Sequence, residues 1–193
     1  MDSTFLFNPF TGKIVPFPSH FQYRSTAYMG FSCNPTSSDC FVVAIEKYHP
    51  KIRLCFNRLG TQEWSYAEFL DETVFCEKSP VFYQEAFYCL GHGVNLEVLQ
   101  FTFGGITWEV LPNPTRPCSY HQNFLVECDG ELLPVFVGAF GEGVYVFKLN
   151  LSSMEWIEVK SLGNFMIYIS GSSSLAAMAT TPGMENKIYF PIF

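Results

Sequence analysis

The stretch of sequence that decides the fold lies in the second half of the chain and reads Phe124-Leu125-Val126-Glu127-Cys128-Asp129-Gly130-Glu131-Leu132-Leu133. Two apolar runs flank Asp129-Gly130, which suits a type I′ turn because both central residues of that turn need a positive φ. The apolar character continues through residues 132–140, where Pro134 and Gly138 interrupt it. The segment therefore predicts a β-hairpin, since the run is too short and too broken to span a membrane as a helix.

Short runs of the same kind fill most of the rest of the chain. They are rich in Val, Ile, Phe and Tyr and alternate with Gly, Pro, Asn and Ser, a pattern that predicts strands with turns about every 8 to 12 residues. Glycines on both sides of His92 predict a second, longer hairpin turn. The strands expected from these runs cover residues 41–45, 52–56, 81–83, 86–90, 96–101, 124–128, 144–149 and 188–190.

Helical spacing is found in one segment, Ser65 to Val74, where Ala67, Leu70 and Val74 recur at i, i+3 and i+7. We expect one short turn or helix there. The fold class predicted for the chain as a whole is all-β.

The composition supports a folded domain and excludes several classes of function. Of the 193 residues, 48% are hydrophobic and 18% aromatic, whereas only 15% are charged, against about 25% in an average soluble domain. Such a chain can bury enough apolar surface to offset the entropy of ordering it, so we expect no disorder. The formal net charge of −7 disfavours nucleic acid as a partner, because nucleic-acid binding needs a basic footprint.

Targeting signals and cysteine usage point to an intracellular protein, cytoplasmic or nuclear. Asp2 stands where a signal peptide carries a base, and we expect no membrane segment. The cysteines are seven, an odd number, and no two have C-x-x-C spacing, which favours reduced, buried thiols over a disulfide framework. They are Cys33, Cys40, Cys55, Cys76, Cys89, Cys118 and Cys128.

A long-period repeat underlies the strands. Trp64, Trp108 and Trp156 are 44 and 48 residues apart, and each follows a short strand and a polar connection. Ile14 takes the place of the tryptophan in a degenerate N-terminal copy. A period of about 40 to 50 residues with about four strands per unit is the signature of a β-propeller, whose twisted sheets bury their faces against one another with large aromatics between them.

The repeat predicts one domain over residues 1–193 with about four blade units. The units lie near 14–63, 64–107, 108–155 and 156–193, with an additional N-terminal strand in 1–13. The alternative is a β-sandwich in which the three tryptophans are evenly spaced by chance. Four blades is the small end of the propeller range, so the chain either closes by pairing its N-terminal strand with its last blade or is an incomplete, open propeller.

Four motifs give the chain a family resemblance. Residues 7–13 followed by Pro16-Phe17-Pro18 resemble an N-P-x-T-G … L-P element, and residues 125–133 resemble an L-V-E-S-x-G-E-L-L strand pair. Residues 146–150 and 156–163 follow in the expected order, and residues 183–190 are similar to a closing G-x-x-x-x-I-Y-F strand. The chain thereby resembles the kelch-like, KIB-type β-propellers of plant F-box proteins from about residue 5 to 192.

The resemblance implies a substrate-receptor module of a ubiquitin ligase. In such proteins an N-terminal F-box segment docks onto a Skp1-type adaptor, and the propeller recruits the protein to be ubiquitinated. Only four residues precede Phe5, so we expect the protein-binding surface of the propeller to carry over, whereas docking of a Skp1-type adaptor is not expected of this chain.

No residue is predicted to be catalytic, to bind a cofactor or to ligate a metal. The four histidines, His20, His49, His92 and His121, are scattered without ligand spacing. Acidic residues at 68–72 and 127–131 are expected to form a solvated rim rather than a catalytic carboxylate pair. We therefore expect the protein not to be an enzyme.

The function predicted from the sequence is non-catalytic protein–protein interaction through loops on one face of the propeller. The candidate loops are Asn34 to Asp39, Asn113 to His121, Gly138 to Gly143 and Ser170 to Ser174, the last expected to be flexible. Two alternatives stay open: a hydrolase or oxidase with its active site in a central propeller channel, and a truncated gene copy without an independent function.

Overall fold

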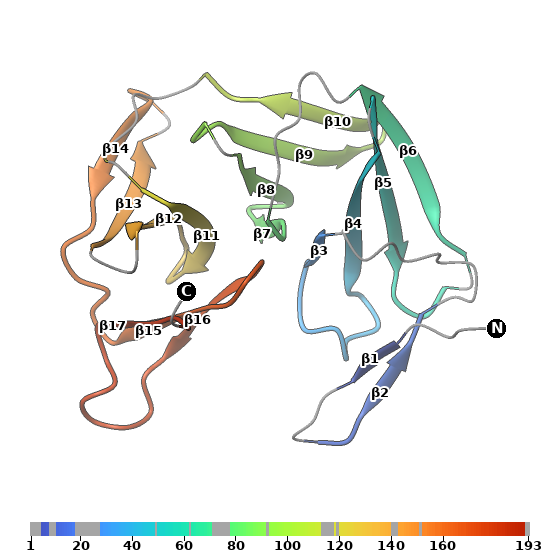
Figure 1. Cartoon of the computed structure of the whole chain (residues 1–193). Coiled ribbons are helices and arrows are strands. Elements are labelled where there is room, and N and C mark those ends of the chain that lie inside the picture. The colour runs from blue at the N-terminus through green and yellow to red at the C-terminus, as the bar shows by residue number, and fades with distance from the viewer. Residues whose placement is uncertain are drawn as a thin grey trace. The chain divides into compact units, whose positions relative to one another are not determined.

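Every regular element in the described part of the chain is a β-strand (Figure 1). The computed structural model describes residues 5–7, 11–17, 28–48, 50–61, 63–70, 78–91, 93–112, 118, 120–139, 143–150 and 152–191. The predicted all-β class is thereby confirmed.

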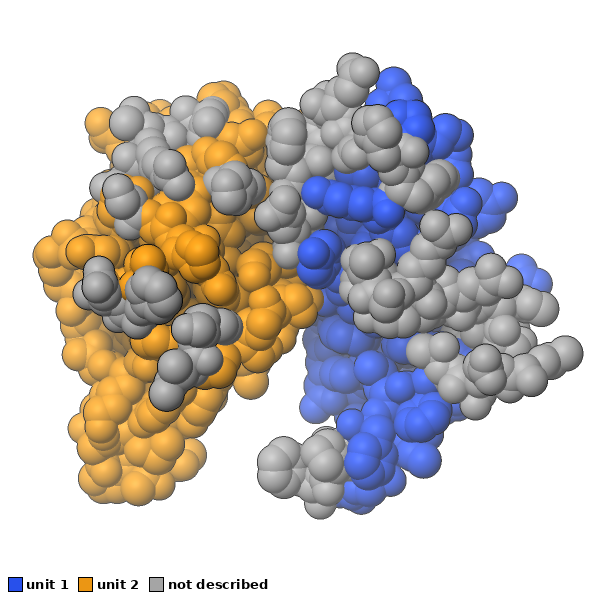
Figure 2. Space-filling model, in the orientation of Figure 1, with its two compact units in different colours: residues 1–74 blue, residues 75–193 orange. Residues whose placement is uncertain are grey.

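The chain divides into two compact units, residues 1–74 and 75–193, which Figure 2 colours separately. Each unit has its own buried apolar clusters and is described by itself. The single domain expected over residues 1–193 and the closure of a ring stay predictions.

The first unit contains a hairpin and a four-stranded antiparallel sheet. Strand β1 (Phe5–Phe7), the predicted N-terminal strand, pairs with β2 (Ile14–Pro16). The sheet consists of β3 (Tyr28–Phe31), β4 (Phe41–Tyr48), β5 (Lys51–Arg58) and β6 (Ser65–Leu70), in chain order. Its apolar cluster contains Phe17, Cys40, Val42 and Leu59, and the Trp64 ring packs edge-on against Phe17 with centroids 5.5 Å apart.

The helix or turn predicted for residues 65–74 is wrong. Residues 65–70 form β6, whose residues pair with β5 from Ser65 opposite Phe56 to Leu70 opposite Lys51, and residues 71–74 lie outside the described part. The helical spacing of the apolar residues does not decide the conformation of this segment. Pairing with β5 decides it, because the backbone of β5 supplies hydrogen-bond partners along the whole of β6. Glu68 of β6 bonds Lys51 at 2.6 Å, so this part of the predicted acidic rim is paired across the strands.

The second unit contains three sheets. The first two are four-stranded and antiparallel, with their strands in chain order, and the third has the order β16-β15-β17, in which β17 runs parallel to β15. The strands are β7 (Val81–Tyr83), β8 (Ala86–Leu90), β9 (Leu96–Thr102), β10 (Gly105–Val110), β11 (Gln122–Cys128), β12 (Glu131–Val137), β13 (Val144–Asn150), β14 (Glu155–Glu158), β15 (Phe165–Ile169), β16 (Ser174–Met178) and β17 (Lys187–Tyr189).

The predicted hairpin at residues 124–133 is confirmed as β11 and β12. Asp129 and Gly130 form its two-residue turn with φ values of 54° and 73°, as a type I′ turn requires. The carboxylate of Glu127 accepts a hydrogen bond from the backbone N–H of Gly130 at 2.9 Å. The hairpin between β8 and β9 is also confirmed; its turn is closed by the N–H of Gly91, which donates to the carbonyl of Asn95.

Strands β11 and β12 are buried on both faces of their sheet. Alternate residues of a strand point to opposite faces, and on one face Phe124, Val126 and Val135 share an apolar cluster with Ile167 and Ile169 of β15. On the other face, Leu125 and Phe136 share a cluster with residues of β8 and β9. The near-continuous apolar sequence of the deciding hairpin is therefore explained by burial on two sides.

The three tryptophans mark equivalent places in the three four-stranded sheets. Trp64 directly precedes β6, whereas Trp108 lies in β10 and Trp156 in β14, so each stands at or in the last strand of its sheet. The sheets span residues 28–70, 81–110 and 122–158. Units that begin at the tryptophans thus start with the last strand of one sheet and continue into the first strands of the next.

Trp108 and Trp156 differ in what their indole N–H groups contact. Trp108 Nε1 donates to Oε2 of Glu97 at 3.0 Å, and Glu97 is fully buried. Glu97 pairs with Val110, two residues beyond Trp108, whereas Phe147 occupies the corresponding place relative to Trp156. The Trp156 indole nitrogen has no hydrogen-bond partner in the described part of the chain.

We expect Trp108→Phe to lower the free energy of unfolding by about 2 kcal/mol more than Trp156→Phe does, because it removes a hydrogen bond to a buried carboxylate. Trp156→Phe is the matched control, since it removes the same indole ring edge without that bond. Urea denaturation followed by circular dichroism measures both values. Equal losses of unfolding free energy for the two variants would contradict a stabilising role of the Trp108–Glu97 hydrogen bond.

We expect Gly130→Ala to cost about 1 kcal/mol, because alanine is strained at the positive φ of the turn. An added Cβ would meet nothing within 4 Å there, nor at Gly171, which has no positive φ. Gly171→Ala is therefore the control and should change stability by less than about 0.5 kcal/mol in the same denaturation experiment. Equal losses of unfolding free energy for Gly130→Ala and Gly171→Ala would contradict the claim that the positive φ of the turn requires glycine at position 130.

Candidate functional site

The loop that joins β3 to β4 is one of the two candidate recognition segments that the structure describes in full. Within it, Oδ1 of Asn34 accepts hydrogen bonds from the backbone N–H of Thr36 at 3.0 Å and from its hydroxyl at 2.9 Å. The N–H of Ser37 donates to the carbonyl of Asn34, and the N–H of Cys40 donates to the carbonyl of Ser37. These bonds fold residues 34–40 into two successive turns. We call residues 32–41 the β3–β4 loop.

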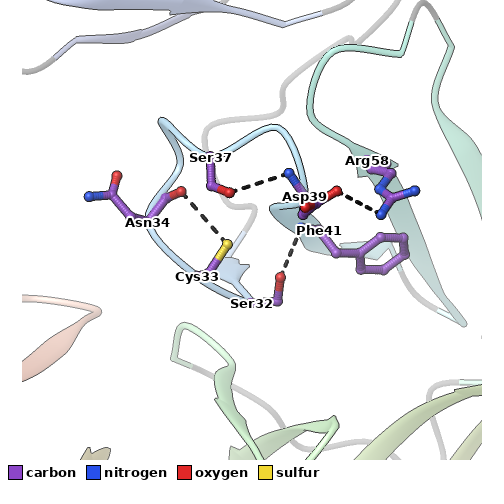
Figure 3. Close-up of polar contacts among 7 residues, drawn as sticks. All are labelled: Ser32, Cys33, Asn34, Ser37, Asp39, Phe41 and Arg58. Atoms are coloured by element: carbon purple, nitrogen blue, oxygen red, sulfur yellow. Dashed lines mark hydrogen bonds and ion pairs between the residues drawn. The ribbon is translucent and has the colours of Figure 1, made fainter.

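The base of the β3–β4 loop is fixed to the sheet (Figure 3). Ser32 donates its N–H to the carbonyl of Phe41 at 2.9 Å, and its hydroxyl accepts the N–H of Phe41 at 2.8 Å. From β5, Nη2 of Arg58 contacts Oδ1 of Asp39 at 2.9 Å. Both side chains of this ion pair are largely exposed, so it adds little stability but presents both charges to solvent.

The Ser170 to Ser174 loop, expected to be flexible, is instead attached to neighbouring strands. The N–H of Ser79 donates to the carbonyl of Ser172, and Nζ of Lys78 donates to the carbonyl of Gly171, both at 2.8 Å. The hydroxyl of Ser174 donates to the carbonyl of Leu125 in β11. The carbonyls of Gly171 and Ser172 and the hydroxyl of Ser174 therefore attach this loop to other segments of the second unit, whereas Ser170 and Ser173 bond each other.

The two other candidate loops lie largely outside the described residues. Of residues 113–121 the structure describes 118, 120 and 121, and of residues 138–143 it does not describe 140–142. The neck of the second loop is defined by a hydrogen bond from the N–H of Gly138 to the carbonyl of Gly143. His20, His49 and His92 also lie outside the described part, and His121 is exposed.

The hairpin tip of β11 and β12 borders an open polar groove in the second unit. Asp129 and Glu131 line it together with Lys148 and Glu158, and Lys148 contacts Glu131 at 3.5 Å. The predicted acidic rim at 127–131 thus faces a groove that also contains a base. A smaller, mainly apolar pocket lies among Tyr83, Leu125 and Trp156.

Two further findings concern metals and membranes. Within the described ranges, no three His, Cys, Asp or Glu side chains gather where they could hold a metal ion. No helix long and apolar enough to cross a membrane occurs in that part of the chain.

The cysteines differ in exposure and in pKa. Burial raises the pKa of Cys55 to about 11, and the nearby charge of Glu46 adds to this. Burial likewise raises the pKa of Cys40 and Cys128. Cys33, in the β3–β4 loop, is exposed. The sequence predicted that the thiols are buried and did not single out Cys33 as exposed. Its exposure depends on where the pairing of β3 with β4 ends, which the sequence does not show.

We expect iodoacetamide at about pH 8 to alkylate Cys33 before Cys40, Cys55 and Cys128 in the folded, reduced protein, because Cys33 is exposed and the reactive form of a thiol is the exposed thiolate. Cys40, Cys55 and Cys128 should react roughly a hundredfold more slowly until the protein unfolds. Peptide mass spectrometry of timed samples measures the order, with a urea-unfolded sample as the control. Equal rates for Cys33 and Cys55 in the folded protein would contradict the burial pattern.

Comparison with known proteins adds a family. The family described as KIB1-4 beta-propeller matches residues 1–191. An F-box/kelch-repeat protein of Arabidopsis thaliana is 31% identical over 96% of this chain and 54% of its own length. An F-box protein of the same plant is 32% identical over 97% of this chain and 52% of its own length. The chain thus spans about half the length of these relatives, and no solved structure matches it significantly.

Proposed function

The chain belongs to the KIB1-4 β-propeller family, and from this we propose that it is a non-catalytic module that recognises other proteins. Its relatives are named F-box and F-box/kelch-repeat proteins. Because the chain belongs to this family, its fold is the β-propeller that the tryptophan repeat predicted. The proposal concerns what the loops of that propeller bind.

The observation that carries the proposal is the construction of the β3–β4 loop. Its turns are held by its own backbone and by Asn34, so the loop is ordered before any partner arrives and little conformational entropy is lost on binding. At the same time Ser37, Ser38 and Asp39 are exposed, and Arg58 stands beside them. Hydroxyl, carboxylate and guanidinium groups on a rigid support are suited to the hydrogen bonds and ion pairs of a protein interface.

We infer further that the partner is a protein selected for ubiquitination and that the whole protein acts inside the cell. The names of the relatives, F-box and F-box/kelch-repeat proteins, support this inference. The net charge of −7 disfavours nucleic acid as the partner. Docking to a Skp1-type adaptor requires an F-box segment. A fusion of such a segment to this chain should recover the adaptor from a plant extract, and failure to do so would remove the adaptor role alone.

We expect Ser38→Arg combined with Asp39→Lys to abolish partner binding, because the pair reverses the charge of the β3–β4 loop. The matched control is Ser152→Arg combined with Glu109→Lys, which makes the same change of charge at exposed positions of the second unit. Affinity capture from a plant extract, with quantitative mass spectrometry, compares the wild-type chain with both variants. A protein retained by wild type and control should be lost from the loop variant.

The affinity of the recovered protein is then measured with purified components. The loop variant should raise Kd at least about tenfold, the loss of one or two good polar contacts, whereas the control should leave it unchanged. Circular dichroism establishes that each variant is folded. An unchanged Kd for the loop variant, or equal losses in both variants, would rule out the β3–β4 loop as the recognition site.

A further inference from the structure

Cys33 and Cys40 face each other across the neck of the β3–β4 loop. The ladder between β3 and β4 pairs Phe31 with Val42, and the N–H of Ser32 donates to the carbonyl of Phe41. The next residues outward on the two arms are Cys33 and Cys40. The N–H of Phe41 donates to the hydroxyl of Ser32 and not to its carbonyl, so the regular ladder ends here, and Cys33 and Cys40 lie on opposite arms just beyond its end.

A disulfide joins residues with Cα atoms about 4.4 to 6.8 Å apart, a range that suits two cysteines on opposite arms at the end of an antiparallel ladder. Sγ of Cys40 donates to the carbonyl of Cys33 at 3.2 Å, so the Cys40 thiol already lies against the backbone of its counterpart. The proximity of the Cys33 thiol is one of the causes, after burial, that raise the pKa of Cys40. Figure 3 shows the Cys33 thiol at the base of the loop, where it contacts the carbonyl of Asn34.

The two thiols have different access to solvent. Cys40 is fully buried in the cluster of Val42 and Leu59, whereas Cys33 is exposed. An oxidant in solution can therefore reach Cys33, and Cys40 can react only with the sulfur of Cys33. This division between an attacked and a resolving thiol is typical of reversible redox sites.

The other buried strand cysteines are placed differently. In their ladders, Cys55 lies opposite Ala44, Cys89 opposite Glu97 and Cys128 opposite Glu131. The Cys33–Cys40 pair is thus set apart by register as well as by exposure.

We propose that Cys33 and Cys40 form a modification site, a dithiol that closes reversibly to a disulfide across the neck of the β3–β4 loop. The oxidant is a small disulfide such as oxidised glutathione. Cys33 loses its proton and attacks one sulfur of this disulfide, which gives a Cys33–glutathione mixed disulfide and one reduced glutathione. Cys40 then loses its proton and attacks the Cys33 sulfur, which releases the second glutathione; the protein gives up two electrons and two protons, and two glutathione thiols gain them.

The test is to incubate the full chain with oxidised glutathione, block remaining thiols and digest with trypsin. Both cysteines fall in one tryptic peptide, residues 25–47, between Arg24 and Lys47. We expect this peptide to be lighter by two hydrogen atoms, to resist alkylation and to regain both thiols after reduction. Cys33→Ser should leave Cys40 unoxidised, and Cys128→Ser, the control, should leave the disulfide intact.

The melting temperature Tm is a second readout of the disulfide. It needs no substitution of Cys40, whose buried position could make a variant unstable. The disulfide should raise Tm of the wild-type chain by about 5 °C, because it constrains the unfolded loop, and should not change Tm of Cys33→Ser. If oxidation stops at glutathione on Cys33 with Cys40 still reduced, or if the peptide stays fully reduced, the proposal is overturned.

The effect of the disulfide on recognition rests on the proposed function and is measured separately. If the loop binds the partner, the Kd of the oxidised and reduced wild-type chains should differ at least threefold, whereas those of Cys33→Ser should not. Formation of the disulfide with no partner binding to either form would overturn the proposed function and leave the modification site standing. If the partner binds the wild-type chain and not the loop variant, but no disulfide forms, the proposed function stands and the modification site is overturned.

Discussion

The rest of the second unit depends on the two-sided burial of strands β11 and β12. A single twisted sheet cannot cover both of its faces, so the apolar residues on each side of this hairpin must pack against other sheets. Phe124 and Val126 do so with β15, and Leu125 and Phe136 with β8 and β9. Strand β11 accordingly contacts β7, β8, β15 and β16. Even the loop of serines 170–174 is used to bond this arrangement together, through Lys78 and Ser174.

The proposed function assigns recognition to the β3–β4 loop. The Ser170 to Ser174 loop is attached to other segments of the second unit through the carbonyls of Gly171 and Ser172 and the hydroxyl of Ser174. The β3–β4 loop satisfies its backbone internally through Asn34 and Ser32, which leaves the side chains of Ser38, Asp39 and Arg58 at the surface. In the proposed function the sheets are the support and one rigid loop makes the contact.

The fold was largely predictable from the sequence, and the details of the site were not. Asp129-Gly130 and the apolar runs around it predicted the central hairpin, because turn chemistry and strand composition are local properties. The segment after Trp64 was misread as helical since pairing with β5, a non-local contact, decides its conformation. The opposition of Cys33 and Cys40 was likewise hidden, because it follows from the register of β3 on β4 and not from the spacing of the two cysteines.

Hydrogen–deuterium exchange followed by mass spectrometry tests the central claim most directly, that a sheet buried on both faces supports recognition loops that the fold does not consume. Amides of β11 and β12 should exchange most slowly, near the rate set by global unfolding, together with those of β8 and β9. Residues 36 and 37, whose amides donate to Asn34, should exchange faster than these strands but more slowly than the same residues in the unfolded chain. Fast exchange in β11 and β12, or exchange of residues 36 and 37 as fast as in the unfolded chain, would contradict the account.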